Sequence, residues 1–138
     1  MKHILFDLEG CDADLLDDAR FVRNTLFHSA ILSNSKILKI DFHQFTPQGV
    51  TGFALLADSH ISIHTWPENN VAKCDIFTCN EKCTPQKAVE YIKEAFKATK
   101  LISQEHERIL TLFFKFFLFV IKIRMWLSIF KRVLRCIF

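Results

Sequence analysis

Half of the 138 residues are hydrophobic, which is enough to fill the core of one domain and excludes an intrinsically disordered chain. The formal net charge of +3 is unevenly distributed, because the segment from Ile109 to the end holds six basic residues and no acidic one. Residues 1–108 are therefore net acidic and carry no basic stripe, which argues against nucleic acid as a partner.

The first half of the chain predicts a strand, a helix and a second strand. Residues 2–8 are a short apolar run typical of a strand. Asp12 or Asp14 can cap a helix that runs to about Ala30, because apolar side chains recur on one face at helical spacing: Leu15, Leu16, Ala19, Val22 and Leu26. Residues 36–43 alternate between apolar and polar side chains, which predicts a half-buried strand.

The second half predicts four strands and a helix. The strands cover residues 50–57, 60–66, 71–78 and 100–108. Thr84 and Pro85 are typical of a helix start, with proline at the first helical position, and this helix runs to about Lys97. The order β-α-β-β-β-β-α-β predicts an α+β fold, a two-layer sandwich in which an antiparallel β-sheet carries both helices on one face.

Residues 109–138 differ from the predicted domain of residues 1–108 in composition. They hold seven of the fifteen phenylalanines, and their longest uncharged apolar run, 116–121, is far shorter than the roughly 20 residues of a spanning helix. Two interpretations of this basic tail stay open: an amphipathic helix at a membrane surface, or an extension that is no part of the domain.

The cysteines and the N-terminus indicate a compartment. Five cysteines are an odd number, and an acidic residue interrupts the first apolar stretch, which is not typical of a signal peptide. We therefore expect a cytoplasmic protein with free thiols.

The stretch ADSHISIHTWPE, residues 57–68, gathers the reactive side chains. A serine can attack the carbonyl before it and convert the amide to an ester. β-Elimination then cuts the chain and leaves a dehydroalanine, which hydrolyses to a pyruvoyl group. This route needs a strained backbone, a proton shuttle and an oxyanion stabiliser.

Ser59 follows the carbonyl of Asp58, and His60 and His64 are nearby shuttles. The chain lacks the Gly-x-Ser-x-Gly frame of serine hydrolases.

Four segments together resemble the short prokaryotic S-adenosylmethionine decarboxylase proenzymes. They read FHQFTPQGVTG (42–52), ADSHISIHTWPE (57–68), CDIFTC (74–79) and EHER (105–108), so the resemblance covers about residues 2–108. It implies a self-cleaving, pyruvoyl-dependent decarboxylase that makes the aminopropyl donor for spermidine. Cleavage at Asp58-Ser59 would give chains of residues 1–58 and 59–138.

The resemblance also implies a role for each matching residue. Ser59 becomes the pyruvoyl group, His64 serves in processing, and Cys79 protonates the carbon that CO2 leaves. Phe45 and Trp66 hold the adenine between them, and Glu68 holds the ribose hydroxyls. No metal is implied. A homodimer is expected, with the site at the interface between subunits, so that Phe45 can act across subunits.

The chemistry expected of the residues agrees with this assignment. Decarboxylation of an α-amino acid needs an electron sink, and a pyruvoyl group that forms an imine with the substrate amine supplies one. S-adenosylmethionine is a sulfonium cation with an aromatic base, which suits two stacked aromatic side chains.

Three alternatives remain at this point. The first is a pyruvoyl-dependent enzyme of the same fold that acts on arginine or ornithine. The second is a metal-binding module that uses His60, His64, Cys74 and Cys79, since imidazole and thiolate suit zinc. The third is an unprocessed, non-catalytic homologue.

Two departures from the family pattern and one geometric problem accompany the assignment. The family usually has Glu where this chain has Asp58, and Gly where it has Ile109. In a straight strand, Ser59 and His64 would lie about 17 Å apart on opposite faces. The assignment therefore requires a bend at Asp58-Ser59, or a neighbouring strand that closes the site.

Overall fold

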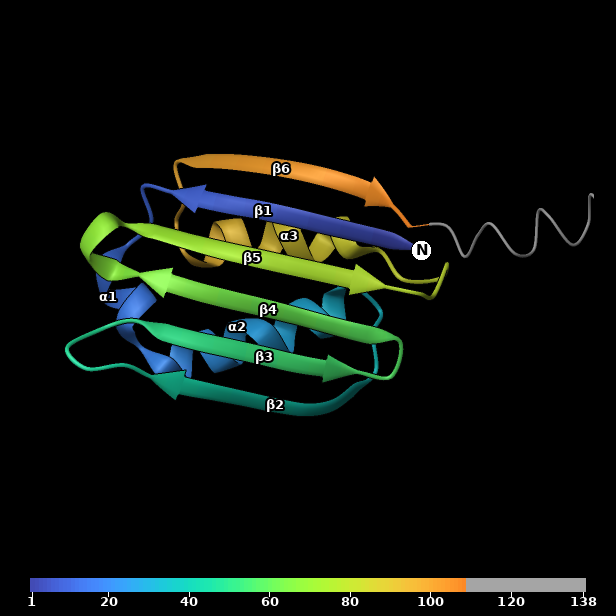
Figure 1. Ribbon diagram of the computed structural model, residues 1–138, viewed down its shortest axis with the longest axis horizontal. Coiled ribbons are helices and arrows are strands. Elements are labelled where there is room, and N and C mark those ends of the chain that lie inside the picture. Colours follow the sequence, from blue (N-terminus) through green and yellow to red (C-terminus); the bar gives the residue numbers. More distant parts are fainter. Residues whose placement is uncertain (109–138) are drawn as a thin grey trace, which may run out of the picture. The chain divides into compact units, whose positions relative to one another are not determined.

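Six antiparallel strands form one sheet in the order β2-β3-β4-β5-β1-β6 (Figure 1). The computed structural model describes residues 1–108, which form one compact unit. The strands are β1 (Lys2–Glu9), β2 (Ile37–Gln44), β3 (Val50–Leu56), β4 (Ser59–Trp66), β5 (Val71–Thr78) and β6 (Lys100–Glu107). The helices are α1 (Ala13–Asp17), α2 (Ala19–Leu32) and α3 (Pro85–Ala95), with a short 3-10 turn, η1 (Pro67–Asn69).

All three α-helices lie against the same face of the sheet (Figure 1), so the predicted α+β sandwich is confirmed. The core between the two layers draws on every second residue of the central strands, as in Ile4, Phe6 and Leu8 of β1. Gly52 lets α2 approach β3 closely, because a Cβ atom there would lie 2.8 Å from Cδ1 of Leu26.

The predicted first helix is in fact two helices, which corrects the sequence interpretation. Asp18 adopts an extended backbone and ends α1. Its carboxylate then accepts hydrogen bonds from the N–H groups of Arg20 and Phe21, so it caps α2, while Asp12 caps α1 in the same way. The apolar spacing continues through the break, and for this reason periodicity alone did not reveal it.

The other predicted boundaries agree with the structure to within two residues. Thr84 does occupy the N-cap position of α3, but its side chain makes no capping hydrogen bond. No helix within residues 1–108 is long and apolar enough to cross a membrane. Both interpretations of the tail concern residues 109–138, which lie outside the described residues.

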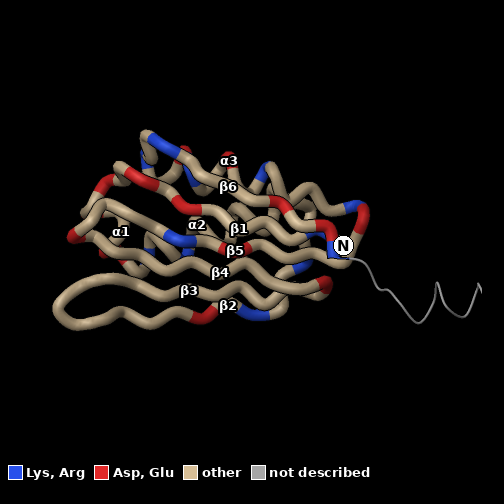
Figure 2. The backbone as a smooth tube through the Cα atoms, turned by 45° about the horizontal axis from the view of Figure 1, so that its top comes forward, with Lys and Arg blue, Asp and Glu red and all other residues tan. Residues whose placement is uncertain are grey.

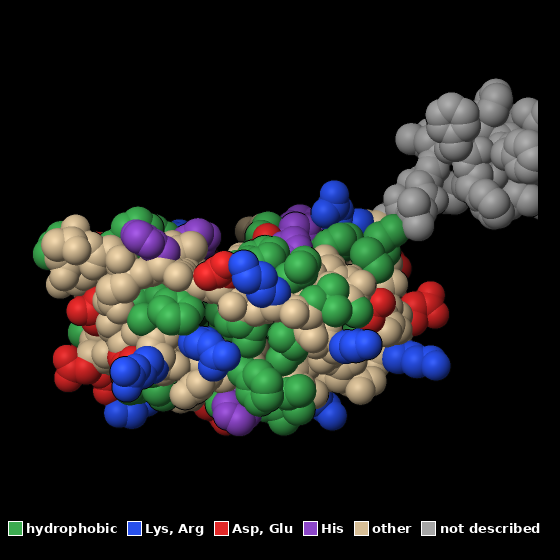
Figure 3. All heavy atoms as spheres, turned by 90° about the horizontal axis from the view of Figure 1, so that it is seen from below, with side chains coloured by type: hydrophobic (Ala, Val, Ile, Leu, Met, Phe, Trp, Pro, Cys, Tyr) green, Lys and Arg blue, Asp and Glu red, His purple; other side chains and the backbone are tan. Residues whose placement is uncertain are grey.

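The second face of the sheet, called the open face below, is not covered by any helix of the described residues (Figure 1). Its surface is apolar in places: Leu5 and Phe53 are each 40% exposed, Leu55 41% and Ile102 42%. Strands β3 and β4 carry no Lys, Arg, Asp or Glu, whereas β1, β5 and β6 carry both signs of charge (Figure 2). Viewed from the β2 edge, hydrophobic and histidine side chains meet along the open face at the top of the picture (Figure 3).

Candidate active site

Ser59 lies directly after the tight turn that joins β3 to β4. Ala57 and Asp58 form this turn, because Leu56 and Ser59 are cross-strand partners. Ser59 has a φ of 149°, a region that residues with a side chain rarely adopt. Such a conformation stores on the order of 1–3 kcal/mol. The chain therefore turns immediately before Ser59, and the backbone strain falls on the serine.

The loop after β5 holds the peptide that precedes Ser59. The backbone N–H of Cys79 donates a hydrogen bond of 3.0 Å to the carbonyl oxygen of Asp58. The side-chain amide of Asn80 donates to the Asp58 carboxylate, also at 3.0 Å. An N–H group aimed at a carbonyl oxygen stabilises the negative charge that develops there during nucleophilic attack. The carbonyl that Ser59 would attack is thus already polarised and fixed.

Two more groups complete this Ser59 end of β4, which comprises Asp58, Ser59, His60, Cys79 and Asn80. The hydroxyl of Ser59 lies 3.3 Å from Nδ1 of His60. The exposed Cys79 borders a hollow that Lys2, Thr78 and Glu107 also line. A hydroxyl, an imidazole and an exposed cysteine are therefore found at one end of the strand.

The aromatic residues of the prediction gather at the other end of β4. A second hollow, the Trp66 end, is lined by Phe45, Gln48, Thr51, His64, Trp66 and Glu68. Gln48 donates a hydrogen bond of 3.0 Å to the carboxylate of Glu68. The rings of His64 and Trp66 lie side by side with centroids 6.3 Å apart. Two aromatic side chains and a carboxylate can hold a planar base and a hydroxyl-bearing group.

The structure does not bring the two ends together within one chain. β4 is a regular strand from Ser59 to Trp66, so Ser59 and His64 stay about 17 Å apart at a rise of about 3.3 Å per residue. The turn at Ala57-Asp58 lies before Ser59 and does not shorten this distance. The neighbouring strand does not close it either, because Thr51 of β3 is the residue opposite His64. The geometric problem raised by the sequence is real.

Three polar residues at the two ends were missed by the sequence interpretation. Thr51 places its hydroxyl 2.9 Å from Nδ1 of His64, and Asn80 and Gln48 bind the carboxylates of Asp58 and Glu68. Thr51 could have been found, because a two-residue turn at Ala57-Asp58 fixes a register that pairs Thr51 with His64. No sequence pattern pointed to Asn80 or Gln48.

The thiols of the described residues differ in environment, and this separates Cys79 from the others. Burial raises the pKa of Cys11 to about 11, and burial raises the pKa of Cys74 well above its usual value. Both therefore stay protonated and unreactive at neutral pH. Cys83 is also buried, whereas Cys79 is exposed beside Ser59.

The alternative of a metal-binding module does not fit the geometry. Cys74 is buried in the core between sheet and helices, while His60 and His64 lie on the open face. The four side chains that the alternative requires therefore do not converge on one point. Within residues 1–108, no group of three His, Cys, Asp or Glu side chains is arranged to hold a metal ion.

Comparison with known proteins tests the family resemblance. The family model for S-adenosylmethionine decarboxylase matches residues 2–109. The S-adenosylmethionine decarboxylase proenzyme of Acetivibrio thermocellus is 39% identical over 107 residues, which are 78% of this chain and 86% of that protein. The proenzyme of the same name from Synechococcus sp. WH7803 is 46% identical over 97 residues, 70% of this chain and 76% of that protein.

A solved structure agrees with these matches. The crystal structure of the adenosylmethionine decarboxylase from Aquifex aeolicus VF5 superimposes with a TM-score of 0.74 at 39% identity. The superposition covers 80% of this chain and 92% of the other. Sequence and fold together establish that the chain belongs to the S-adenosylmethionine decarboxylase family.

Proposed function

We propose that this protein cuts itself between Asp58 and Ser59 and then decarboxylates S-adenosylmethionine with the pyruvoyl group formed from Ser59. The product would be the decarboxylated aminopropyl donor used for spermidine. The observation that carries the proposal is the strained Ser59, with a φ of 149°, next to a carbonyl that already accepts a hydrogen bond from the Cys79 N–H. This is the arrangement that an attack of the serine hydroxyl on the preceding peptide requires.

The residues around Ser59 suit a pyruvoyl group. Once formed, this group supplies the electron sink that decarboxylation of an α-amino acid needs. The cut replaces the strained peptide by two chain ends and thereby relieves the strain at Ser59. Cys79 directly follows Thr78, the cross-strand partner of Ser59, and so remains near the new end of the second chain. Its N–H is a backbone group, so it stays available after the cut.

The Trp66 end supports an adenosyl substrate. Phe45 and Trp66 offer two aromatic faces, 48% and 37% exposed, to a flat base and a sulfonium cation. Glu68 offers a carboxylate that Gln48 already orients, which suits ribose hydroxyls. Arginine and ornithine have no ring to fill the space between the aromatic side chains.

The distance between the two ends suggests a site shared by two copies of the chain. Two sheets that pack face to face lie about 10 Å apart, and a two-fold axis between the open faces and perpendicular to β4 would set one β4 against the other in the opposite direction. The Ser59 end of one copy would then meet the Trp66 end of its partner. The exposed apolar side chains of the open face, Leu5, Phe53 and Leu55, would be buried in such a homodimer.

The proposed function is tested by following CO2 release from carboxyl-labelled S-adenosylmethionine, arginine and ornithine. We expect turnover of S-adenosylmethionine by the cleaved protein and no measurable turnover of the other two. A preference for arginine or ornithine would replace the proposed substrate. No turnover of any of the three would favour a non-catalytic homologue.

Mixed dimers test the shared site. We expect no decarboxylation by Ser59→Ala and little by Trp66→Ala, since each lacks one end of every site. Co-expression of the two should restore roughly a quarter of the wild-type rate, because half of the random dimers are mixed and each of these has one complete site.

The matched control pairs Ser59→Ala with Cys79→Ala, which remove groups from the same end. This pair should restore nothing beyond the activity of Cys79→Ala alone. If the first pair also failed to exceed the sum of its separate variants, the site would lie within one chain.

A further inference from the structure

A chain of polar side chains leads away from Ser59 across the open face. His60 of β4 points its Nε2 toward Asp75 of β5, 3.7 Å from Oδ2. The other oxygen of Asp75 accepts a hydrogen bond of 2.7 Å from Nε2 of His3 on β1. Since Nδ1 of His60 faces the Ser59 hydroxyl at 3.3 Å, the order is Ser59, His60, Asp75, His3.

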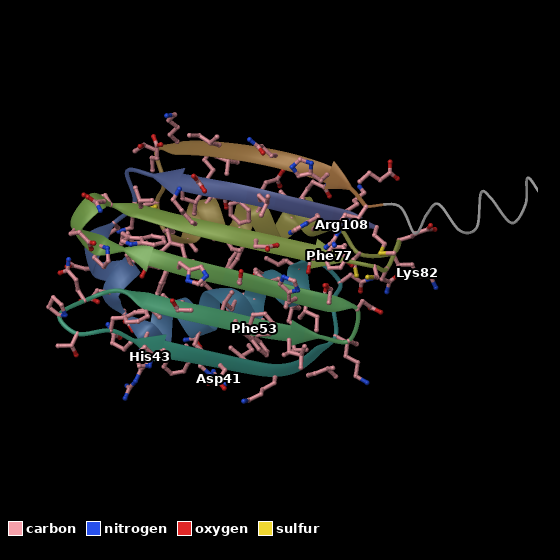
Figure 4. The ribbon with its side chains drawn as sticks, in the orientation of Figure 1. Asp41, His43, Phe53, Phe77, Lys82 and Arg108 are labelled. Atoms are coloured by element: carbon pink, nitrogen blue, oxygen red, sulfur yellow. The ribbon has the colours of Figure 1, made fainter. Side chains whose placement is uncertain are left out.

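The three ionisable side chains in this row, His3, His60 and Asp75, are partly buried. His3, His60 and Asp75 keep 20%, 30% and 29% of their side-chain surface exposed. The His60 ring stacks on Phe53, with centroids 5.5 Å apart and planes 22° apart, and approaches Phe77 at 6.1 Å. Figure 4 places these two phenylalanines on β3 and β5, on either side of β4. The ring of His60 is therefore held in one orientation.

The orientation decides which nitrogen of His60 can act as a base. A carboxylate beside Nε2 favours the tautomer that carries its proton there, which leaves the lone pair of Nδ1 free to accept the proton of Ser59. Serine proteases divide the roles in the same way between serine, histidine and aspartate, with the two ring nitrogens exchanged. The hydrogen bond from His3 fixes Asp75 in turn.

We infer that His60 is the base that activates Ser59 for self-cleavage, with Asp75 and His3 as the residues that position it. The inference rests on the proposed function. In this step His60 accepts the proton of the Ser59 hydroxyl while the oxygen attacks the carbonyl carbon of Asp58. The C–N bond then breaks and His60 returns the proton to the Ser59 nitrogen, so that an ester and a free amine replace the amide. His64 lies at the Trp66 end, where its ring contacts the hydroxyl of Thr51, and it has no contact with Ser59 of the same chain. We therefore assign the role of His64 in processing to the later elimination step.

The test isolates ester formation from the later elimination. Full-length chain is made by cell-free synthesis, and samples taken over time are treated with hydroxylamine, which cleaves an ester between residues 58 and 59 but not an amide. Intact mass then gives the fraction of chains that have either formed the ester or completed self-cleavage. We expect His60→Gln to lose about 10²–10⁴-fold in the rate of ester formation.

Variants of Asp75 and His3 show whether these two residues position His60 or only stabilise the fold. Asp75→Asn should slow ester formation less than His60→Gln does, and Asp75→Glu should recover part of that loss because a carboxylate is restored. His3→Gln should slow it least. Melting temperatures of all variants are measured alongside, and a loss of rate without a matching fall in melting temperature supports the positioning role.

His28→Gln and Asp41→Asn are the matched controls, since His28 lies on α2 and Asp41 pairs with Lys39 instead of a histidine. Both should form the ester at the wild-type rate. Ester formation by His60→Gln at the wild-type rate would overturn the inference while leaving the proposed function intact. Equal rates for Asp75→Asn and Asp75→Glu would overturn the positioning role of its carboxylate. A wild-type chain that never forms the ester would refute the proposed function itself.

Discussion

Ser59→Ala should leave the chain whole, while the wild-type protein separates into residues 1–58 and 59–138. Alanine keeps the strand but has no hydroxyl to attack the Asp58 carbonyl, so neither ester nor elimination can follow. The second wild-type chain should lack a free amine at its N-terminus and react with phenylhydrazine, because a ketone has replaced the serine. Intact mass and carbonyl labelling after prolonged incubation measure both properties.

The control for this experiment is Ser62→Ala, which removes a hydroxyl from the same strand three residues later. It should cleave as the wild type does. Cleavage of Ser59→Ala at the same bond would show that Ser59 is not the attacking residue. Asp58 is expected to permit cleavage in place of the family's usual Glu, because its carbonyl oxygen keeps the hydrogen bond from Cys79.

Local patterns were sufficient to predict most of this fold. The strand predicted over residues 71–78 has the same bounds as β5 in the structure. The break at Asp18 was missed, since several aspartates in this segment could cap a helix and the apolar spacing continues through it. Which aspartate ends a helix depends on how the helix meets the sheet, and a one-dimensional pattern does not contain that information.

The candidate site was predictable only where its residues are close in sequence. Asp58, Ser59, His64 and Trp66 lie on one continuous stretch, so the motif drew attention to them together. His3 and Asp75 come from two other strands, 72 residues apart, and meet only because β1 pairs with β5. The motif also did not reveal that the two ends of β4 are far apart, because residues that are five to seven positions apart in an extended strand do not lie close together in space.

Cys79→Ala should separate self-cleavage from decarboxylation. The backbone N–H of residue 79, which binds the Asp58 carbonyl, survives this substitution, and Ser59 and His60 are untouched. The variant should therefore cleave to a substantial extent and react with phenylhydrazine. It should also retain S-adenosylmethionine binding, because Phe45 and Trp66 remain.

Turnover by Cys79→Ala should nevertheless fall by about 10²–10⁴-fold, the usual cost of losing a positioned acid. Without the thiol, the substrate carbon that has lost CO2 lacks its proton donor. Cys79→Ser should be nearly as slow, since a hydroxyl is a much weaker acid than a thiol. Single-turnover CO2 release, divided by the number of phenylhydrazine-reactive sites, gives the rate per processed chain.

Cys11→Ala is the matched control, because it removes a thiol that is buried and protonated. It should lower the melting temperature through the cavity it leaves, while the rate per processed chain stays near the wild-type value. Near-normal turnover by Cys79→Ala would remove this thiol from the mechanism. If Cys79→Ala failed to cleave, its side chain would instead belong to self-processing, and the backbone N–H alone would be insufficient for the attack by Ser59.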